Sequence, residues 1–214
     1  MKARLLLYSL AVLTLALAPA LAMAQQMTFT ALRNSSATFK TDAPLETVVG
    51  TTAGGAVSGT VTGDPARPQA ATGTIRIDLT ALKTGIDKRD SDMRGKDYFD
   101  TENEANRYAI FELKGVEMAG PLEPGKETLA RLKGILTIKQ KPVETTANAR
   151  ITYVKLTPEQ LETQKRFGFT SDNIRVKVQF TTSFTNHGMQ IPQLMFFKLS
   201  NNIQIETDLT LVRQ

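Results

Sequence analysis

The sequence predicts an all-β protein with one or two short helices. Apolar and polar residues alternate over several stretches, which is the period of half-buried strands. Glycine and proline turn signals separate these stretches, and only one stretch carries clear signals for both the start and the end of a helix. Together they predict seven or eight strands, a number typical of a sandwich or a barrel. Periodicity does not choose between these two architectures.

The first 24 residues form a separate segment, which we expect to be a secretory signal peptide. Lys2 and Arg4 precede an apolar run from Leu5 to Leu17, and a small-residue cleavage site ends at Ala24. The apolar run is short for a membrane span. The segment predicts export to the periplasm, with secretion as the alternative, and leaves residues 25–214 as one domain.

The composition excludes several kinds of chemistry. The chain has no cysteine, so disulfides, thiolate metal sites and cysteine nucleophiles are excluded. His187 is the only histidine, which excludes a metal site built on several imidazoles. Because Gly188 follows it, we expect His187 to be exposed in a turn. We expect neither a catalytic site nor a metal site.

The charge is moderately basic and uneven. The net charge is +5, and loss of Lys2 and Arg4 with the leader gives 26 − 2 − 21 = +3. Residues 126–177 hold eleven basic and five acidic residues. Such a face either lies transiently against a membrane surface with anionic head groups or simply keeps strand edges soluble. Nucleic acid is not an expected partner, because no aromatic-basic recognition motif occurs.

Three strand regions precede the middle of the chain. Residues 35–41 form the first, with Phe39 directed inward. Residues 46–62 are rich in valine and threonine and form either one long strand bent at Gly54-Gly55 or a hairpin that turns there. Residues 72–79 form the third, and its inward face holds Ile75, Ile77 and Leu79.

The second half contains five further strand regions and one helix. The strands cover residues 107–117, 129–140, 143–154, 174–184 and 203–212. The helix is expected over residues 158–166, with Thr157 as its N-cap, Pro158 at the first position and Gly168 beyond its end. The inward residues of these strands include Phe111, Leu113, Leu136, Ile138, Val176, Val178, Phe180 and Ile205.

Residues 78–100 join two strands and do not follow a strand pattern. From Lys83 to Arg107 the chain holds six basic and seven acidic residues. One interpretation is a solvated connection with internal ion pairs. The other is a short helical lid, with Met93, Tyr98 and Phe99 turned onto an apolar opening.

This region resembles the signature of the YceI-like family of lipid-binding or polyisoprenoid-binding proteins. The signature has a T-G-x-x-x-R-D turn, represented by Thr84-Gly85 and Arg89-Asp90, and then a D-F-F-D element, represented by residues 97–100. The chain has Asp92 where the family often has histidine, so a role for that imidazole does not transfer. The resemblance extends over most of residues 35–212.

The resemblance implies an antiparallel, eight-stranded, lipocalin-like barrel that holds a polyisoprenoid-type lipid or a quinone in its interior. It implies no catalysis and no cofactor apart from the bound lipid. The protein is expected to be a monomer or a homodimer. The alternatives are a protein-interaction module with a self-filled core, and an enzyme in which Asp90, Asp97 or Asp100 serves as a base.

The candidate ligand-binding residues follow from the inward faces and the lid. The apolar stretch from Ile191 to Phe197 either fills the core or lines the mouth of the barrel. Lys88, Arg89 and Arg94 are expected to reach a polar head group near the lid. The apolar candidates are Phe39, Ile75, Ile77, Leu79, Met93, Tyr98, Phe99, Phe111, Leu113, Leu136, Ile138, Val176, Val178, Phe180, Met195, Phe196, Phe197 and Ile205.

Overall fold

A computed structural model describes residues 25–194 and 196–214 of the chain, so the expected signal peptide lies outside the described residues. Two α-helices, α1 (Asp87–Arg94) and α2 (Pro158–Gln164), accompany the strands. The strands are β1 (Met27–Ala31), β2 (Ser36–Ala43), β3 (Glu46–Thr52), β4 (Val57–Asp64), β5 (Arg67–Asp78), β6 (Leu82–Lys83), β7 (Tyr108–Glu117), β8 (Glu127–Ile138), β9 (Lys141–Lys155), β10 (Asp172–Ser183), β11 (Gln193–Leu194), β12 (Phe197–Lys198) and β13 (Asn202–Arg213).

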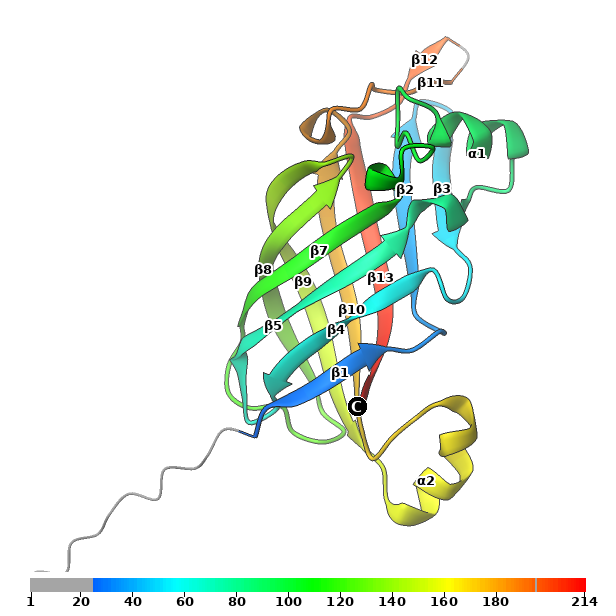
Figure 1. Ribbon diagram of the computed structural model, residues 1–214. Helices are drawn as coiled ribbons and strands as arrows, with labels where there is room; N and C mark the ends of the chain where they lie inside the picture. The colour runs from blue at the N-terminus through cyan, green and yellow to red at the C-terminus, as the bar shows by residue number, and fades with distance from the viewer. Residues whose placement is uncertain (1–24, 195) are drawn as a thin grey trace, which may run out of the picture.

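Antiparallel pairing closes the main sheet into a barrel (Figure 1). β1 pairs with β4 on one side and with β13 on the other, and Phe29 lies opposite both Val61 and Arg213. In the described part of the chain, eight strands therefore form the ring, in the order β1, β4, β5, β7, β8, β9, β10 and β13. The predicted eight-stranded antiparallel barrel is confirmed.

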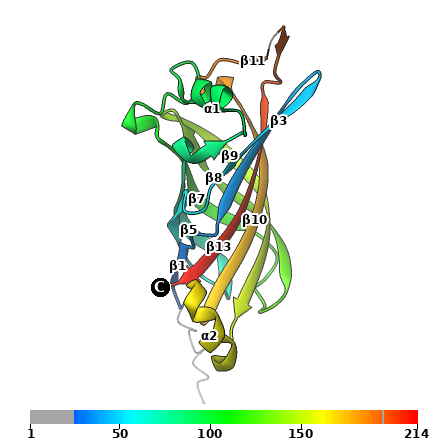
Figure 2. The same cartoon turned by 90° about the vertical axis from the view of Figure 1, so that its right-hand side faces the viewer.

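β13 pairs with two different strands along its length. Its end near the C-terminus pairs with β1, whereas residues 204–208 pair with β2. β2, β3 and β6 continue the wall at the upper end, where Thr51 of β3 lies opposite Lys83 of β6 (Figures 1 and 2). The barrel is consequently assembled from different strands at its lower and upper ends.

The structure corrects both interpretations of residues 46–62. β3 and β4 are separate strands that do not pair with each other, because β3 pairs with β2 and β6, and β4 pairs with β1 and β5. Gly55 has a φ of 87° and donates its N–H to the Arg33 carbonyl at 2.8 Å. The glycines thus allow the chain to cross between two parts of the wall.

The helices lie at opposite ends of the barrel (Figure 1). α2 begins as predicted, with Thr157 and Gln160 forming a capping box and Pro158 in the first turn. A 3-10 turn follows, and Gly168 ends it with a φ of 88°. α1 lies at the upper end and forms the predicted helical part of the charged segment.

The inward residues form two apolar clusters, one above the other. The lower cluster includes Phe29 and Leu211, and the upper cluster includes Phe39 and Leu136. Three partly buried residues pack against both clusters: Ile77, Phe111 and Phe180. The ring centroids of Phe111 and Phe180 are 6.4 Å apart, so an aromatic pair marks the boundary.

A buried carboxylate connects three strands at the lower end. Asp172 of β10 accepts hydrogen bonds from the hydroxyls of Tyr153 and Ser171, and from Arg213 Nη1 at 3.1 Å. Burial, and then the bond to Asp172, raise the pKa of Tyr153 to about 12. Burial works against the charged form of Asp172, but these hydrogen bonds outweigh it and lower its pKa. The cluster links β9, β10 and β13.

The expectation of an exposed His187 is wrong. Its side chain is 0% exposed, because the 3-10 turn Thr185–His187 packs against β9. Nδ1 lies 3.1 Å from the Lys141 carbonyl, and Nε2 lies 2.8 Å from the Thr182 hydroxyl. A carbonyl only accepts, so Nδ1 carries the proton and Nε2 accepts from Thr182. Burial lowers the pKa of His187 and keeps the ring neutral.

This burial predicts a pH dependence that one residue controls. The pKa of His187 in the folded protein lies below its ordinary value of 6.5. The free energy of unfolding is therefore highest above pH 6.5 and falls as the pH drops below that value, by up to about 1.4 kcal/mol per pH unit. Urea unfolding between pH 7 and about pH 5, above the carboxylate range, measures this slope. H187Q should remove the slope in that interval, and an unchanged slope in the variant would contradict the assignment.

Candidate ligand-binding cavity

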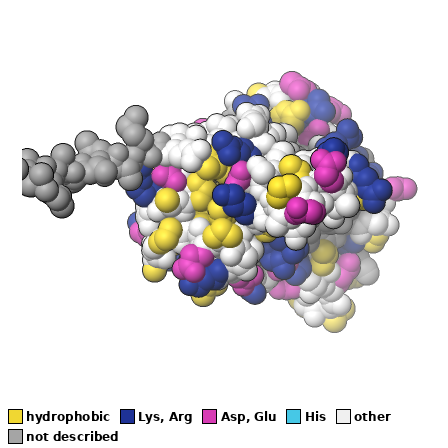
Figure 3. All heavy atoms as spheres, turned by 90° about the horizontal axis from the view of Figure 1, so that it is seen from below, with side chains coloured by type: hydrophobic (Ala, Val, Ile, Leu, Met, Phe, Trp, Pro, Cys, Tyr) yellow, Lys and Arg dark blue, Asp and Glu magenta, His cyan; other side chains and the backbone are white. Residues whose placement is uncertain are grey.

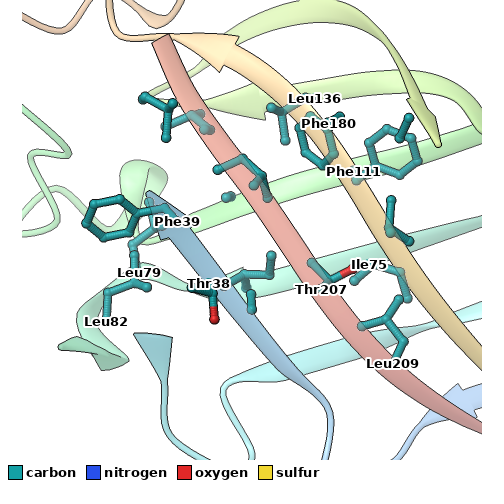
Figure 4. A pocket seen from close by; sticks show the side chains of 18 of the residues that line it. Thr38, Phe39, Ile75, Leu79, Leu82, Phe111, Leu136, Phe180, Thr207 and Leu209 are labelled. Carbon is teal, nitrogen blue, oxygen red and sulfur yellow. The ribbon is translucent and has the colours of Figure 1, made fainter. Parts of the chain in front are cut away.

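The barrel encloses a cavity of about 430 Å³, which extends from the β4–β5 turn at the lower end to α1 at the upper end. Its size falls within the usual range for small-molecule sites. Figure 4 shows side chains from several strands directed into this space. The interior is therefore not filled by the protein's own side chains, contrary to the self-filled alternative.

Most of the predicted apolar candidates line this cavity. Strand alternation explains the placement of those on the strands, because inward residues of every barrel strand face the same enclosed space. Leu79, Met93, Tyr98 and Phe99 reach it from the segment between β5 and β7. The candidates that line it are Phe39, Ile75, Ile77, Leu79, Met93, Tyr98, Phe99, Phe111, Leu113, Leu136, Ile138, Val176, Val178, Phe180 and Ile205.

The segment before β13 differs from the expectation. Phe196 is 90% exposed and Phe197 is 40% exposed, and neither lines the cavity. They belong to the small β11–β12 hairpin, which projects beyond the upper end of the barrel (Figure 2). Met195 lies outside the described residues. Among the described residues of this stretch, Pro192 and Gln193 contribute to the lining.

Several lining residues were not predicted. Leu209 and Leu211 share the inward parity of Ile205, so the alternation already carried the signal for them. Phe29 was missed because residues 25–34 carry no clear pattern, although they contain β1. Small residues such as Ala37 and Ala71 also line the lower part, where they leave space. Thr207 is a polar residue within this apolar wall.

The T-G-x-x-x-R-D motif fixes the lid to the barrel. Asp90 is 2% exposed and accepts hydrogen bonds from the Thr84 N–H and hydroxyl, both at 2.7 Å. Arg89 donates to the Thr84 hydroxyl at 3.1 Å and to Glu46 at the start of β3 at 2.8 Å. Burial works to raise the pKa of Asp90, but the bonds from Thr84 outweigh it, and the pKa is lowered. Asp90 is thus ionised and structural.

The cations at the mouth are paired. Lys88 and Arg89 both line the cavity mouth, but Lys88 bonds to Asp92, one helical turn away, and Arg89 bonds to Glu46. Arg94 does not line the cavity. Tyr98 lies at the same rim, and burial, followed by the charges of Asp97 and Asp92, raises the pKa of its hydroxyl. At neutral pH this rim carries closely balanced charges.

The other carboxylates proposed as bases also serve the local structure. Asp97 accepts a hydrogen bond from Gln190 at 3.0 Å, and Asp100 accepts one from Asn106 at 3.0 Å. Across residues 25–194 and 196–214, no group of three or more metal-ligating side chains is placed to hold an ion.

Some of the basic residues of the second half form ion pairs with nearby carboxylates. Figure 3 shows the lower face, where charges of both signs alternate with apolar side chains. No helix in the described ranges has the length and hydropathy to cross a membrane. The paired basic residues include Lys126, Arg131, Lys133, Lys165 and Arg175, which contact Glu123, Glu117, Glu162 and Asp208.

A closed antiparallel barrel around an apolar cavity, covered by a tethered helix, defines a ligand-holding β-barrel. The chain belongs to the YceI-like family, because the model of the YceI-like domain matches residues 28–211. Among curated protein sequences, none matches this chain.

Solved structures of low sequence identity share the fold. A polyisoprenoid-binding domain from Saccharophagus degradans has a TM-score of 0.64 at 14% identity, with 89% of this chain and 100% of that chain covered. Burkholderia cenocepacia BcnA has a TM-score of 0.60 at 16% identity, with 82% of this chain and 95% of that chain covered. The Campylobacter jejuni YceI protein has a TM-score of 0.58 at 15% identity, with 78% of this chain and 85% of that chain covered.

We expect D90A to loosen the lid. The substitution leaves two Thr84 donors without their acceptor, which should lower the free energy of unfolding by about 1–3 kcal/mol. It should also speed amide hydrogen exchange in α1. In the wild type, the pKa of Asp90 is lowered from its ordinary value of 3.8. The ionised carboxylate therefore stabilises the fold fully above pH 3.8, and this stabilisation is lost as the pH falls below that value.

The matched control is D92A. Asp92 lies on the same helix, but within the described residues its one ion pair is the exposed contact with Lys88. Its loss should therefore change stability by no more than about 0.5 kcal/mol. Equal effects of the two substitutions would contradict the role assigned to Asp90.

Proposed function

We propose that this protein is a non-catalytic carrier of a polyisoprenoid-type lipid, such as a polyprenyl species or a quinone, in the periplasm. The apolar cavity inside the closed barrel is the observation that carries the proposal. The fold shared with the polyisoprenoid-binding domain of Saccharophagus degradans supports the lipid class. The leader at residues 1–24 supports export.

The driving force is removal of apolar surface from water. Transfer of each methylene of an isoprenoid chain from water is favourable by about 0.8 kcal/mol. The cavity wall offers aliphatic and aromatic contacts over the full depth of the barrel, from Phe29 and Leu211 to Phe99 and Met93. A cavity of 430 Å³ suits part of a long chain, and the remainder would fold back or protrude at the mouth.

The arrangement around the cavity favours binding over catalysis. A catalytic base must reach the substrate with a free lone pair, whereas Asp90 is buried beneath the lid and is bonded to Thr84. A contact between a polar head group and Lys88, Arg89 or Arg94 stays a prediction. Contact with a membrane surface, through which a lipid would enter, belongs to the same proposal.

Extraction of the purified protein tests the ligand directly. Protein produced with its leader in a host that makes isoprenoids, then extracted with organic solvent, should release an isoprenoid detectable by mass spectrometry. The protein should be recovered from the periplasmic fraction. Recovery of protein without any bound lipid from native preparations would contradict the carrier role.

A plug inside the barrel should remove the lipid without unfolding the protein. Ile205 is a partly buried residue of β13 that lines the cavity, so I205W directs a larger ring into the space. We expect the lipid recovered per protein to fall strongly while the circular dichroism spectrum is unchanged. Q204W is the control, since Gln204 is the adjacent exposed residue on the outer face. Equal lipid content in both variants would argue against the cavity as the site.

A further inference from the structure

Thr207 is a polar residue of the cavity wall whose side chain makes no hydrogen bond with the described part of the protein. Thr207 lies on β13 between the inward residues Ile205 and Leu209, opposite Ala37 and Val178 on the two neighbouring strands. Figure 4 shows its side chain projecting from β13 into the pocket. Within the described ranges, its hydroxyl takes part in none of the side-chain hydrogen bonds that the structure forms.

Other threonines near the cavity are satisfied. Thr41 donates to the Ser200 carbonyl at 3.2 Å, and Thr52 accepts from the Ala37 N–H at 3.0 Å. Thr38 donates to the Thr51 hydroxyl at 3.2 Å. Thr207 therefore differs from its neighbours, because its hydroxyl faces the cavity without a protein partner.

This placement has an energetic consequence when a guest fills the cavity. A buried hydroxyl without a hydrogen bond is unfavourable, because it loses its contact with water and gains nothing in return. A hydrocarbon guest would leave Thr207 in that state. A guest with a neutral oxygen at this depth would accept or donate the missing hydrogen bond. An ionised head group would itself be strongly unfavourable among these apolar side chains.

On the basis of the proposed function, we propose that Thr207 selects isoprenoids that carry a neutral hydroxyl or carbonyl oxygen and holds that oxygen inside the barrel. The guest then enters with its oxygenated end first. Thr207 lies between the two apolar clusters, at the level just below Ile205 and Phe180, so the oxygenated end passes the Phe111–Phe180 pair. This placement would replace the predicted head-group contacts of Lys88 and Arg89, whose side chains are paired with Asp92 and Glu46.

The test compares two guests of equal chain length. Squalene is a pure hydrocarbon, and a polyprenol with the same number of isoprene units adds one hydroxyl. Binding of both to the delipidated full-length mature protein is measured by competition with a fluorescent apolar probe. The wild type should prefer the polyprenol, and T207V should reduce that preference by about 2- to 10-fold, the worth of one hydrogen bond, while squalene binds as well or better.

Three further variants make the result specific. T207S keeps the hydroxyl and should keep the preference, whereas T207A should lose it even if the valine variant folds poorly. T210V is the matched control on the outward side of the same strand, and it should leave both affinities unchanged.

The outcomes separate the two proposals. If T207V and T207A change the affinities for squalene and polyprenol equally, the role of Thr207 is wrong. The same holds if neither variant changes either affinity. In both cases the carrier function stands. If neither guest binds the wild type, the carrier function itself is wrong.

Discussion

The closure of the barrel through the pairing of β1 with β13 is the constraint on which the rest of the structure depends. In an antiparallel strand, alternate side chains face opposite sides of the sheet. Once β1 joins β13, every inward side chain faces one enclosed space and no edge remains along the lower ring. Asp172 reinforces this region by joining β9, β10 and β13 through Tyr153 and Arg213.

The same closure explains how a short motif can control access to the interior. The upper end is completed by β2, β3 and β6, and β6 leads directly into the lid. Arg89 and Asp90 bind back to Thr84 in that connection, and Arg89 also reaches Glu46 on β3. The residues of the T-G-x-x-x-R-D motif therefore hold the lid on the wall, and these contacts form without a ligand.

Sequence reasoning succeeded where the signal is local and periodic. The inward parity of Phe111 and Leu113, and of Val176 to Phe180, follows from alternation, and the start of α2 follows from Thr157 and Pro158. It failed where tertiary contacts decide the outcome. Residues 46–62 predict either one strand bent at Gly54-Gly55 or a hairpin that turns there, but pairing with distant strands places β3 and β4 apart. Asn186-His187-Gly188 reads as an exposed turn, yet packing against β9 buries the imidazole.

The cavity exists because closure holds the walls apart while small residues line part of them. Ala37 and Ala71 contribute little volume, and Gly134 lies against the Phe111 ring, where an added Cβ would stand 2.5 Å from Cζ. Collapse to fill this space would require breaking the strand pairs that close the ring. An apolar space without a guest forfeits dispersion contacts along its lining, and a guest that binds only the folded state stabilises it in proportion to the logarithm of its concentration over Kd. For the proposed carrier, the stability of the barrel and its occupancy are therefore thermodynamically linked, and both depend on the pairing that closes the sheet.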